Sequence, residues 1–252
     1  MQVRTFQASK AGAARHENED SVDLRRRSPG ELGIVLADGA STGVFSKGWS
    51  AHLAATFGEH LDCALESFDA VLELARATFS PDLSRHTALR KFLTEGSFAT
   101  LLAARVELVQ DAGRGGERSY ALTMAAVGDA CLIALDADGS CVLAFPCVSA
   151  ADFGNTPNLI RSSAKLQERT PYRRQNARSP VRGTCTLLAA TDAFAELVVR
   201  KVACRQSGEL LRRLLECEEE ARFAALVAEL RRDHGMKNDD VSIVLIQDGG
   251  DA

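Results

Sequence analysis

The sequence lacks several features that would assign it to a class at once. No apolar run approaches the roughly 18 residues that span a bilayer, and the N-terminal residues contain no continuous apolar stretch of the kind found in signal peptides. Positive charge is not in excess, because 30 Lys and Arg stand against 34 Asp and Glu, for a net charge of −4. Proteins that bind nucleic acid show a basic balance or stripe. We therefore expect a cytoplasmic protein with no membrane and no nucleic-acid partner.

The cysteines show no pattern of a disulfide framework or of a zinc site. There are seven, an odd number, and none forms a C-x-x-C pair. Most lie among apolar neighbours, as Cys131 and Cys185 do. This pattern is typical of buried free thiols in a reducing compartment, not of a disulfide scaffold or a zinc site. Nothing marks any of them as a low-pKa nucleophile.

The chain does have the length and apolar content of a folded domain. Its 252 residues are 46% hydrophobic, and a chain of this length buries roughly three quarters of its unfolded surface. No Pro-, Ser- or Gly-rich linker divides the sequence. We therefore expect a single domain over residues 1–252.

Apolar periodicity predicts strands in the first third, the middle and the end of the chain, with helices between them. The expected strands are 1–9, 21–25, 32–37, 97–109, 119–135, 142–145, 185–190 and 241–246. The expected helices are 49–61, 68–79, 193–203 and 207–233, with a turn at 26–30. Because tight βαβα alternation is missing, we predict an α+β fold with mostly antiparallel sheets.

Several aspartates stand at or near the ends of these expected strands. They are Asp20, Asp38, Asp129, Asp192 and Asp239. Carboxylates that converge in space repel one another and are driven towards protonation unless a cation neutralises them. Oxygen ligands in a chain with only 5 histidines favour Mg²⁺ or Mn²⁺ over zinc. For any one of these acids alone, a role as a turn former or helix cap is the simpler interpretation.

Six short segments around these acids form a second pattern. They are 15–20 (RHENED), 37–40 (ADGA), 95–100 (EGSFAT), 127–130 (VGDA), 190–193 (ATDA) and 238–242 (NDDVS). Each segment is a weak pattern by itself, but their order and spacing span nearly the whole chain. In that order they resemble the motifs of the metal-dependent serine/threonine protein phosphatases of type 2C, the PPM family, and in particular its compact bacterial members.

The resemblance implies a fold and a metal centre. The fold would be a β-sandwich of two mostly antiparallel sheets flanked by helices, with two Mg²⁺ or Mn²⁺ ions, and a weaker third, in a cleft at one end. Asp38 would bridge the two ions, with the carbonyl of Gly39 on one of them. Asp192 and Asp239 would bind the second ion.

The remaining site residues follow from the same resemblance. Glu19 and Asp20 would hold metal-bound waters or bind directly, and Asp129 would bind the third ion together with Asp192. Arg15 sits where the family places its phosphate-gripping arginine. A water that bridges the metals would attack phosphorus directly, so that no phospho-enzyme forms.

Three residues depart from the family pattern. Ala40 stands where some members have a histidine proposed as the general acid, and His16 is a poor substitute. Ala193 replaces a glycine. Asp240 replaces an asparagine beside Asp239, which leaves open which of the two binds metal; we favour Asp239.

The stretch 161–182 is strongly basic. Its cations are Arg161, Lys165, Arg169, Arg173, Arg174, Arg178 and Arg182, against the single acid Glu168. With Pro171 and Pro180, it is expected to form a mobile loop or irregular lobe beside the cleft. It would either steer acidic phosphoproteins to the site or serve only as a solvated surface.

The leading hypothesis is a Mg²⁺- or Mn²⁺-dependent protein serine/threonine phosphatase, a hydrolase of bacterial signalling that opposes a Ser/Thr kinase. Its substrates would be phosphoserine and phosphothreonine in proteins. Two alternatives stay open. One is a catalytically silent, phosphatase-like scaffold, and the other is a phosphohydrolase for a small phosphorylated metabolite.

Overall fold

The computed structural model describes residues 1–81, 86–110, 118–154, 156–168, 171–183 and 185–247. Two five-stranded sheets form its centre, and their strand pairs are antiparallel. In the first sheet the order is β1 (Gln2–Ala8), β12 (Val241–Gln247), β11 (Cys185–Ala190), β7 (Cys131–Asp136) and β8 (Cys141–Phe145). In the second sheet it is β10 (Gln175–Arg182), β6 (Arg118–Val127), β5 (Leu101–Gln110), β3 (Glu31–Asp38) and β2 (Asp20–Ser28). A small ribbon pairs β4 (Phe98–Ala99) with β9 (Ile160–Arg161).

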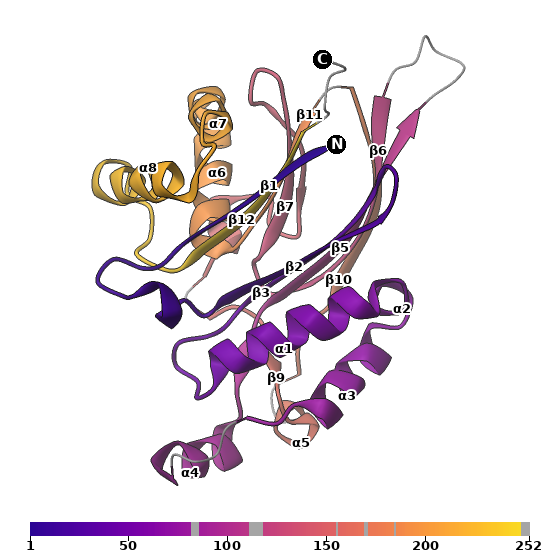
Figure 1. Ribbon diagram of the computed structural model, residues 1–252, viewed down its shortest axis with the longest axis vertical. Helices are drawn as coiled ribbons and strands as arrows, with labels where there is room; N and C mark the ends of the chain where they lie inside the picture. Colours follow the sequence, from indigo (N-terminus) through magenta and orange to yellow (C-terminus); the bar gives the residue numbers. More distant parts are fainter. Residues whose placement is uncertain (82–85, 111–117, 155, 169–170, 184, 248–252) are drawn as a thin grey trace.

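Helices cover the outer face of each sheet, so that the molecule has four layers (Figure 1). The helices on the second sheet are α1 (Ser46–Glu59), α2 (Leu61–Glu66) and α3 (Phe68–Thr78). Those on the first sheet are α6 (Asp192–Ala203), α7 (Ser207–Leu215) and α8 (Glu220–Asp233). The others are α4 (His86–Glu95), α5 (Ala164–Gln167), η1 (Arg15–Glu17) and η2 (Ala150–Asp152). Within the described residues, no helix is both long and apolar enough to cross a membrane.

The layers follow from the burial of both faces of the central strands. In β3, Leu32, Ile34 and Leu36 face the core between the sheets, whereas Val35 and Ala37 face the core under α1–α3. Side chains alternate between the two faces of a strand, so a strand covered on both sides needs an unbroken apolar run. This explains why the sequence from 32 to 37 contains no charged residue.

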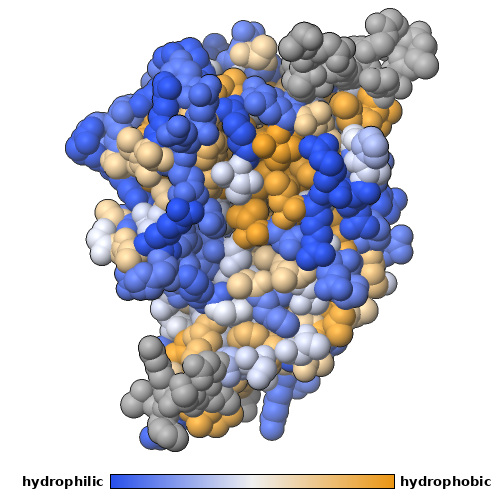
Figure 2. Space-filling model, viewed as in Figure 1, coloured by the Kyte–Doolittle hydropathy of each residue, from blue (hydrophilic) through white to orange (hydrophobic). Residues whose placement is uncertain are grey.

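One edge of the sandwich is less well covered than its faces. Figure 2 shows apolar side chains gathered between two polar bands, in the region where Figure 1 draws β1 and β2. Met1, Val3 and Val22, from the beginning of the chain and these two edge strands, are only partly buried against the core between the sheets. The inter-sheet core therefore reaches the surface along this edge.

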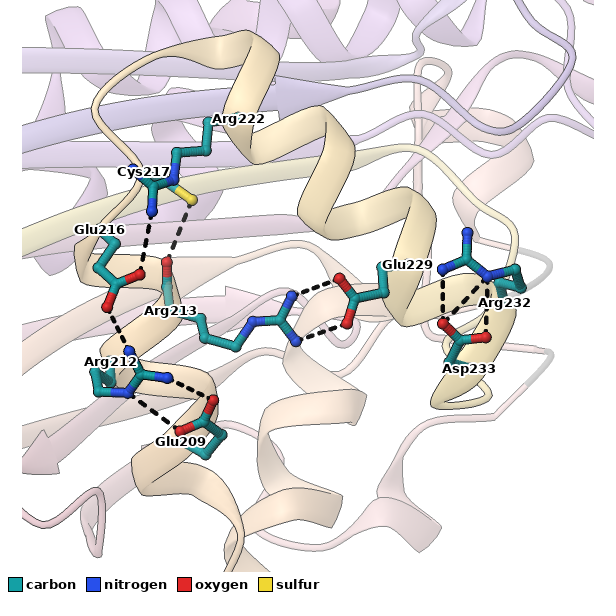
Figure 3. A network of polar contacts seen from close by, with 9 residues as sticks. All are labelled: Glu209, Arg212, Arg213, Glu216, Cys217, Arg222, Glu229, Arg232 and Asp233. Carbon is teal, nitrogen blue, oxygen red and sulfur yellow. Dashed lines mark hydrogen bonds and ion pairs between the residues drawn. The ribbon is translucent and has the colours of Figure 1, made fainter.

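The helix predicted at 207–233 is wrong as a single element, because the structure breaks it into α7 and α8. The carbonyls of Leu215 and Cys217 accept hydrogen bonds from Nη1 of Arg4 at 2.8 and 2.7 Å, and these bonds satisfy the backbone where the chain turns. The two helices then lie side by side, joined by Arg213 and Glu229 through contacts of 2.9 and 2.6 Å (Figure 3).

The irregular lobe predicted at 161–182 is also wrong in large part. The described residues of this stretch include the end of β9, all of α5 and the whole of β10, while Arg169 lies outside them. Pro180 does not prevent β10 from forming, because β10 is an edge strand and Pro180 needs no donor on its open side. The basic stretch is thus mostly ordered secondary structure.

Two smaller differences concern element ends. β2 continues to Ser28, so that the turn expected at 26–30 contracts to residues 29 and 30. Helix α4 is absent from the prediction, although Ala88, Leu89, Phe92 and Leu93 have helical spacing in its ten residues. The strand expected at 119–135 is also wrong as a single element, because the chain turns at 128–130, between β6 and β7, where Asp129 lies.

Candidate metal centre

Five predicted ligands, four aspartates and Gly39, line one cavity of about 490 Å³. Asp38 ends β3, Asp129 lies in the turn between β6 and β7, Asp192 begins α6, and Asp239 precedes β12. The cavity is lined by Asp38, Gly39, Ala40, Ser41, Thr42, Thr100, Asp129, Gly154, Thr156, Pro157, Leu159, Asp192, Lys237 and Asp239. Segments from both sheets, far apart in the sequence, therefore bring their acids to the same place.

The acids of this cavity act on one another electrostatically. Burial raises the pKa of Asp38 well above its usual value, and the negative charges of the neighbouring aspartates raise it further. The pKa of Asp129 is raised to about 7, first by burial and then by the charge of Asp192. Burial and the charge of Asp239 also raise the pKa of Asp192. Clustered carboxylates with raised pKa values form a site that a cation would stabilise.

Buried oxygen atoms without hydrogen-bond partners make these acids candidate ligands for a divalent cation. Neither carboxylate oxygen of Asp129, which is 3% exposed, has a hydrogen-bond partner, and Oδ1 of Asp20 has none. Buried polar groups are normally paired, so these oxygens are open to a ligand. The donors are all oxygen, as Mg²⁺ and Mn²⁺ prefer. In the described part of the chain, however, no three His, Cys, Asp or Glu side chains are already drawn together tightly enough to hold an ion.

Asp38 and Gly39 are placed by the contact between β2 and β3. In this pairing Asp38 lies directly opposite Asp20, an arrangement of like charges that destabilises a sheet. The N–H of Gly39 donates to the carbonyl of Glu19 at 3.2 Å. A Cβ at position 39 would lie 2.9 Å from that carbonyl oxygen and 2.9 Å from the carbonyl of Ser46. Close backbone packing therefore requires glycine here, which the sequence did not reveal.

Asp129 is directed by a tight turn. Gly128 has a φ of +97°, a left-handed conformation that favours glycine. A Cβ there would lie 2.5 Å from the side chain of Thr100. Gly128 thus allows β6 to end and Asp129 to reach the cavity wall.

Asp20 lies on the other side of Asp38 and lines a neighbouring cavity of about 360 Å³. Its Oδ2 accepts a hydrogen bond from Oγ1 of Thr191 at 2.9 Å, and Oγ1 of Thr191 accepts one from the N–H of Ser242 at 3.0 Å. Burial raises the pKa of Asp20 to about 7. Asp20 therefore joins the end of the second sheet to β11 and β12 of the first.

Asp239 and Asp240 occupy different environments. Asp239 lines the acidic cavity. Asp240 is 4% exposed, and its two oxygens accept the backbone N–H groups of Lys10 and Glu19 at 2.8 and 2.9 Å. This arrangement supports Asp239 as the ligand and gives Asp240 a role in holding the loop before β2.

The structure does not bring Glu19 or Arg15 to the wall of the acidic cavity. The carboxylate of Glu19 accepts a hydrogen bond from the hydroxyl of Ser41 and lies 3.7 Å from Nζ of Lys10. Arg15 belongs to η1 and forms an ion pair with Glu220 of α8 at 2.7 Å. It lines the same neighbouring cavity as Asp20. The roles of Glu19 and Arg15 stay predictions.

Lys237 is a residue of this site that the sequence analysis missed. Its Nζ lies 3.1 Å from Oε2 of Glu196 and 3.9 Å from Oδ2 of Asp192. Burial acts to lower the pKa of Lys237, but the hydrogen bond to Glu196 and the surrounding negative charge outweigh it, so that the pKa is raised. The available signal was a cation two residues before Asp239 in the segment K-N-D-D.

Comparison with known proteins rests on structure alone, since no family model and no curated protein sequence matches the chain. The photosystem II phosphatase PBCP is similar, with a TM-score of 0.63 and 14% identity over 98% of each chain. The serine/threonine phosphatase Stp1 from Staphylococcus aureus is similar with a TM-score of 0.61 and 13% identity, and the match covers 99% of this chain and 96% of that one. A bacterial serine phosphatase is similar with a TM-score of 0.58 and 13% identity, and the match covers 100% of this chain and 99% of that one. The fold is that of the type 2C serine/threonine phosphatases.

The type 2C fold confirms the α+β sandwich predicted from the sequence. At 13–14% identity the likeness shows the fold and not the activity.

Proposed function

We propose that the protein is a Mg²⁺- or Mn²⁺-dependent phosphatase that hydrolyses phosphoserine and phosphothreonine in proteins. One observation carries the proposal: four aspartates from separate elements line a single cavity of a type 2C fold, with raised pKa values and buried oxygens open to a cation. The substrate would be a phosphoprotein made by a Ser/Thr kinase in the cytoplasm.

The family resemblance implies which residues would hold two divalent ions, and Asp38, Gly39, Asp192 and Asp239 among them line the cavity. Asp38 would lie between the ions with the carbonyl of Gly39, and Asp192 and Asp239 would bind the second ion. Glu19 and Asp20, where β2 begins, would hold water molecules bound to the ions or bind the ions directly. When bound, two such ions lower the pKa of water and offset the charge of the phosphoryl group.

Arg15 would hold the phosphate oxygens. The side chains of its ion pair with Glu220 are 78% and 43% exposed, and exposed pairs of this kind contribute only about 0–1 kcal/mol. Arg15 can therefore exchange Glu220 for a phosphate at little cost, and its planar guanidinium suits two phosphate oxygens at once.

The described residues of the cavity wall include no cysteine, so that nothing there competes with water as a thiol nucleophile. No described histidine lines this cavity either, so that the proton for the leaving oxygen would come from water or from another group. Direct hydrolysis without a phospho-enzyme is the mechanism that this wall supports.

Hydrolysis of a phosphothreonine peptide and of an aryl phosphate, with and without Mn²⁺, tests the proposal. We expect Mn²⁺-dependent turnover by the wild type and a loss of about 100-fold or more in kcat for Asp38→Asn, because one preorganised charged group is commonly worth that much. Asp233→Asn, on the exposed surface of α8, is the matched control and should keep full activity.

Two results would favour the alternatives. A folded wild type that binds the phosphopeptide but never hydrolyses it would indicate a silent scaffold. Faster turnover of sugar or nucleotide phosphates than of phosphopeptides would indicate a metabolite phosphohydrolase.

A further inference from the structure

Lys237 places a fixed positive charge in the wall of the acidic cavity. It is the only cation among the described residues that line this cavity. Its side chain is 33% exposed, and Nζ lies within 4 Å of two carboxylates, at 3.1 Å from Glu196 and 3.9 Å from Asp192. The ammonium group of Lys237 is thus held in the cavity wall by these two carboxylates.

Two features fix the position of this ammonium group. Glu196 follows Asp192 by four residues in α6, so that both carboxylates lie on one face of the helix. The residues on either side of Lys237 are anchored: the N–H of Met236 donates to the carbonyl of Leu230 at 3.2 Å, and Oδ1 of Asn238 accepts from the N–H of Ala11 at 2.7 Å. Lys237 therefore reaches Asp192 from a backbone that has little freedom to move away.

The charge of Lys237 acts on Asp129 as well as on Asp192. All three residues line the same cavity, and Nζ of Lys237 lies 3.9 Å from Oδ2 of Asp192, so that its positive charge acts against the negative charge of both carboxylates. Asp129 and Asp192 are the two residues at which the family resemblance implies a third metal ion. In this chain a cation of the protein lies beside Asp192 and lines the same cavity as Asp129.

We infer that the ammonium group of Lys237 takes the place of a third divalent cation between Asp129 and Asp192, so that this chain binds two divalent ions and supplies the third positive centre itself. The inference rests on the proposed two-metal function. A divalent ion on the same carboxylates would meet the ammonium at close range, and like charges in a partly buried site repel strongly. A single tethered charge also stays in place at low metal concentration.

Counting bound Mn²⁺ in the full chain tests this inference. The measurement is electron paramagnetic resonance of free Mn²⁺ in titrations that extend to millimolar metal. We expect two ions for the wild type and for Lys237→Arg, which keeps the charge. Lys237→Met should bind three, the third more weakly, and the added site should disappear in the double variant with Asp129→Asn.

Lys201→Met is the matched control, because Lys201 lies on the same helix as Asp192 but contacts Gln206 and lines another cavity. It should bind two ions. Three ions in the wild type, or two ions with unchanged affinity in a folded Lys237→Met, would overturn the inference while leaving the two-metal phosphatase intact. A wild type that binds no Mn²⁺ at all would instead contradict the proposed function itself.

Discussion

At the scale of single residues, the neighbours Asp239 and Asp240 lie in different surroundings, which predicts a role in metal binding for Asp239 and a role in folding for Asp240. Asp239 lines the acidic cavity, whereas Asp240 holds two backbone N–H groups. Asp240→Ala should therefore lower the free energy of unfolding by about 3 kcal/mol, because two buried donors lose a charged acceptor. Urea denaturation measures this change.

Asp239→Asn should weaken metal binding and leave the stability of the metal-free protein almost unchanged. We expect Mn²⁺ affinity to fall at least about tenfold, since a charged ligand is lost, with little change in the stability of the metal-free protein. Mn²⁺ titration measures the affinity. Equal loss of stability in Asp239→Asn and Asp240→Ala would contradict this division of roles.

Gly39 gives a second prediction at this scale. Gly39→Ala places a Cβ 2.9 Å from two backbone carbonyl groups, and such overpacking destabilises proteins by about 1–3 kcal/mol. The control is Gly48→Ala in α1, where the nearest atom of another element is 3.8 Å away. Thermal unfolding should show a loss for Gly39→Ala and none for Gly48→Ala.

Four of the acids that line the cavity could be predicted at this scale as candidate ligands, whereas the contacts around them could not. Asp38, Asp192 and Asp239 were marked by the buried runs beside them and by the family motifs. Lys237 and the crowding at Gly39 depend on which segments meet in space. No local pattern in the sequence carries that information.

At the scale of elements, strands with both faces buried were the most predictable parts of the fold. β3, β11 and β12 carry mostly apolar residues with no charge between their ends, and their predicted ranges agree with the structure to within one residue. The break between α7 and α8 was missed because it depends on Arg4, which comes from the opposite end of the chain. β10 was missed because its residues are mostly polar, as an exposed edge strand allows.

The basic segment gives a prediction at this scale. Arg174 lies over the ring of Phe68 at 5.6 Å, and Tyr172 packs on the core under α1–α3, so this segment has a fixed place before β10. If its charge steers phosphoproteins, Arg173→Gln with Arg174→Gln should slow a phosphoprotein about tenfold at low salt and leave an aryl phosphate unaffected. The measurement is the rate of hydrolysis of both substrates at two salt concentrations. An equal effect of the substitutions on both substrates would refute steering.

At the scale of the whole molecule, the acidic cavity makes stability depend on pH in an unusual direction. In the metal-free protein Asp20 and Asp129 have pKa values of about 7, against 3.8 for the ordinary carboxyl. Between these values the folded state keeps protons that the unfolded chain releases, so stability falls as pH rises from about 4 to 7.

In EDTA the Tm should accordingly be higher at pH 5 than at pH 8, by about 5 °C. Saturating Mn²⁺ should raise the Tm more at pH 8, where the carboxylates are free of protons. Asp129→Asn removes one of these groups and should flatten the pH dependence. A metal-free Tm that stays constant or increases between pH 5 and pH 8 would show that the acids do not repel one another in the folded state.

The central claim is that Asp38, Asp192 and Asp239, brought together by the two sheets, share a pair of divalent ions. The most direct test is a crystal structure of the protein grown with Mn²⁺, in which anomalous scattering locates the metal. We predict two Mn²⁺ peaks in the acidic cavity, with these three carboxylates in their coordination shells. A cavity free of anomalous density at saturating Mn²⁺, with the three carboxylates too far apart to share an ion, would contradict the claim.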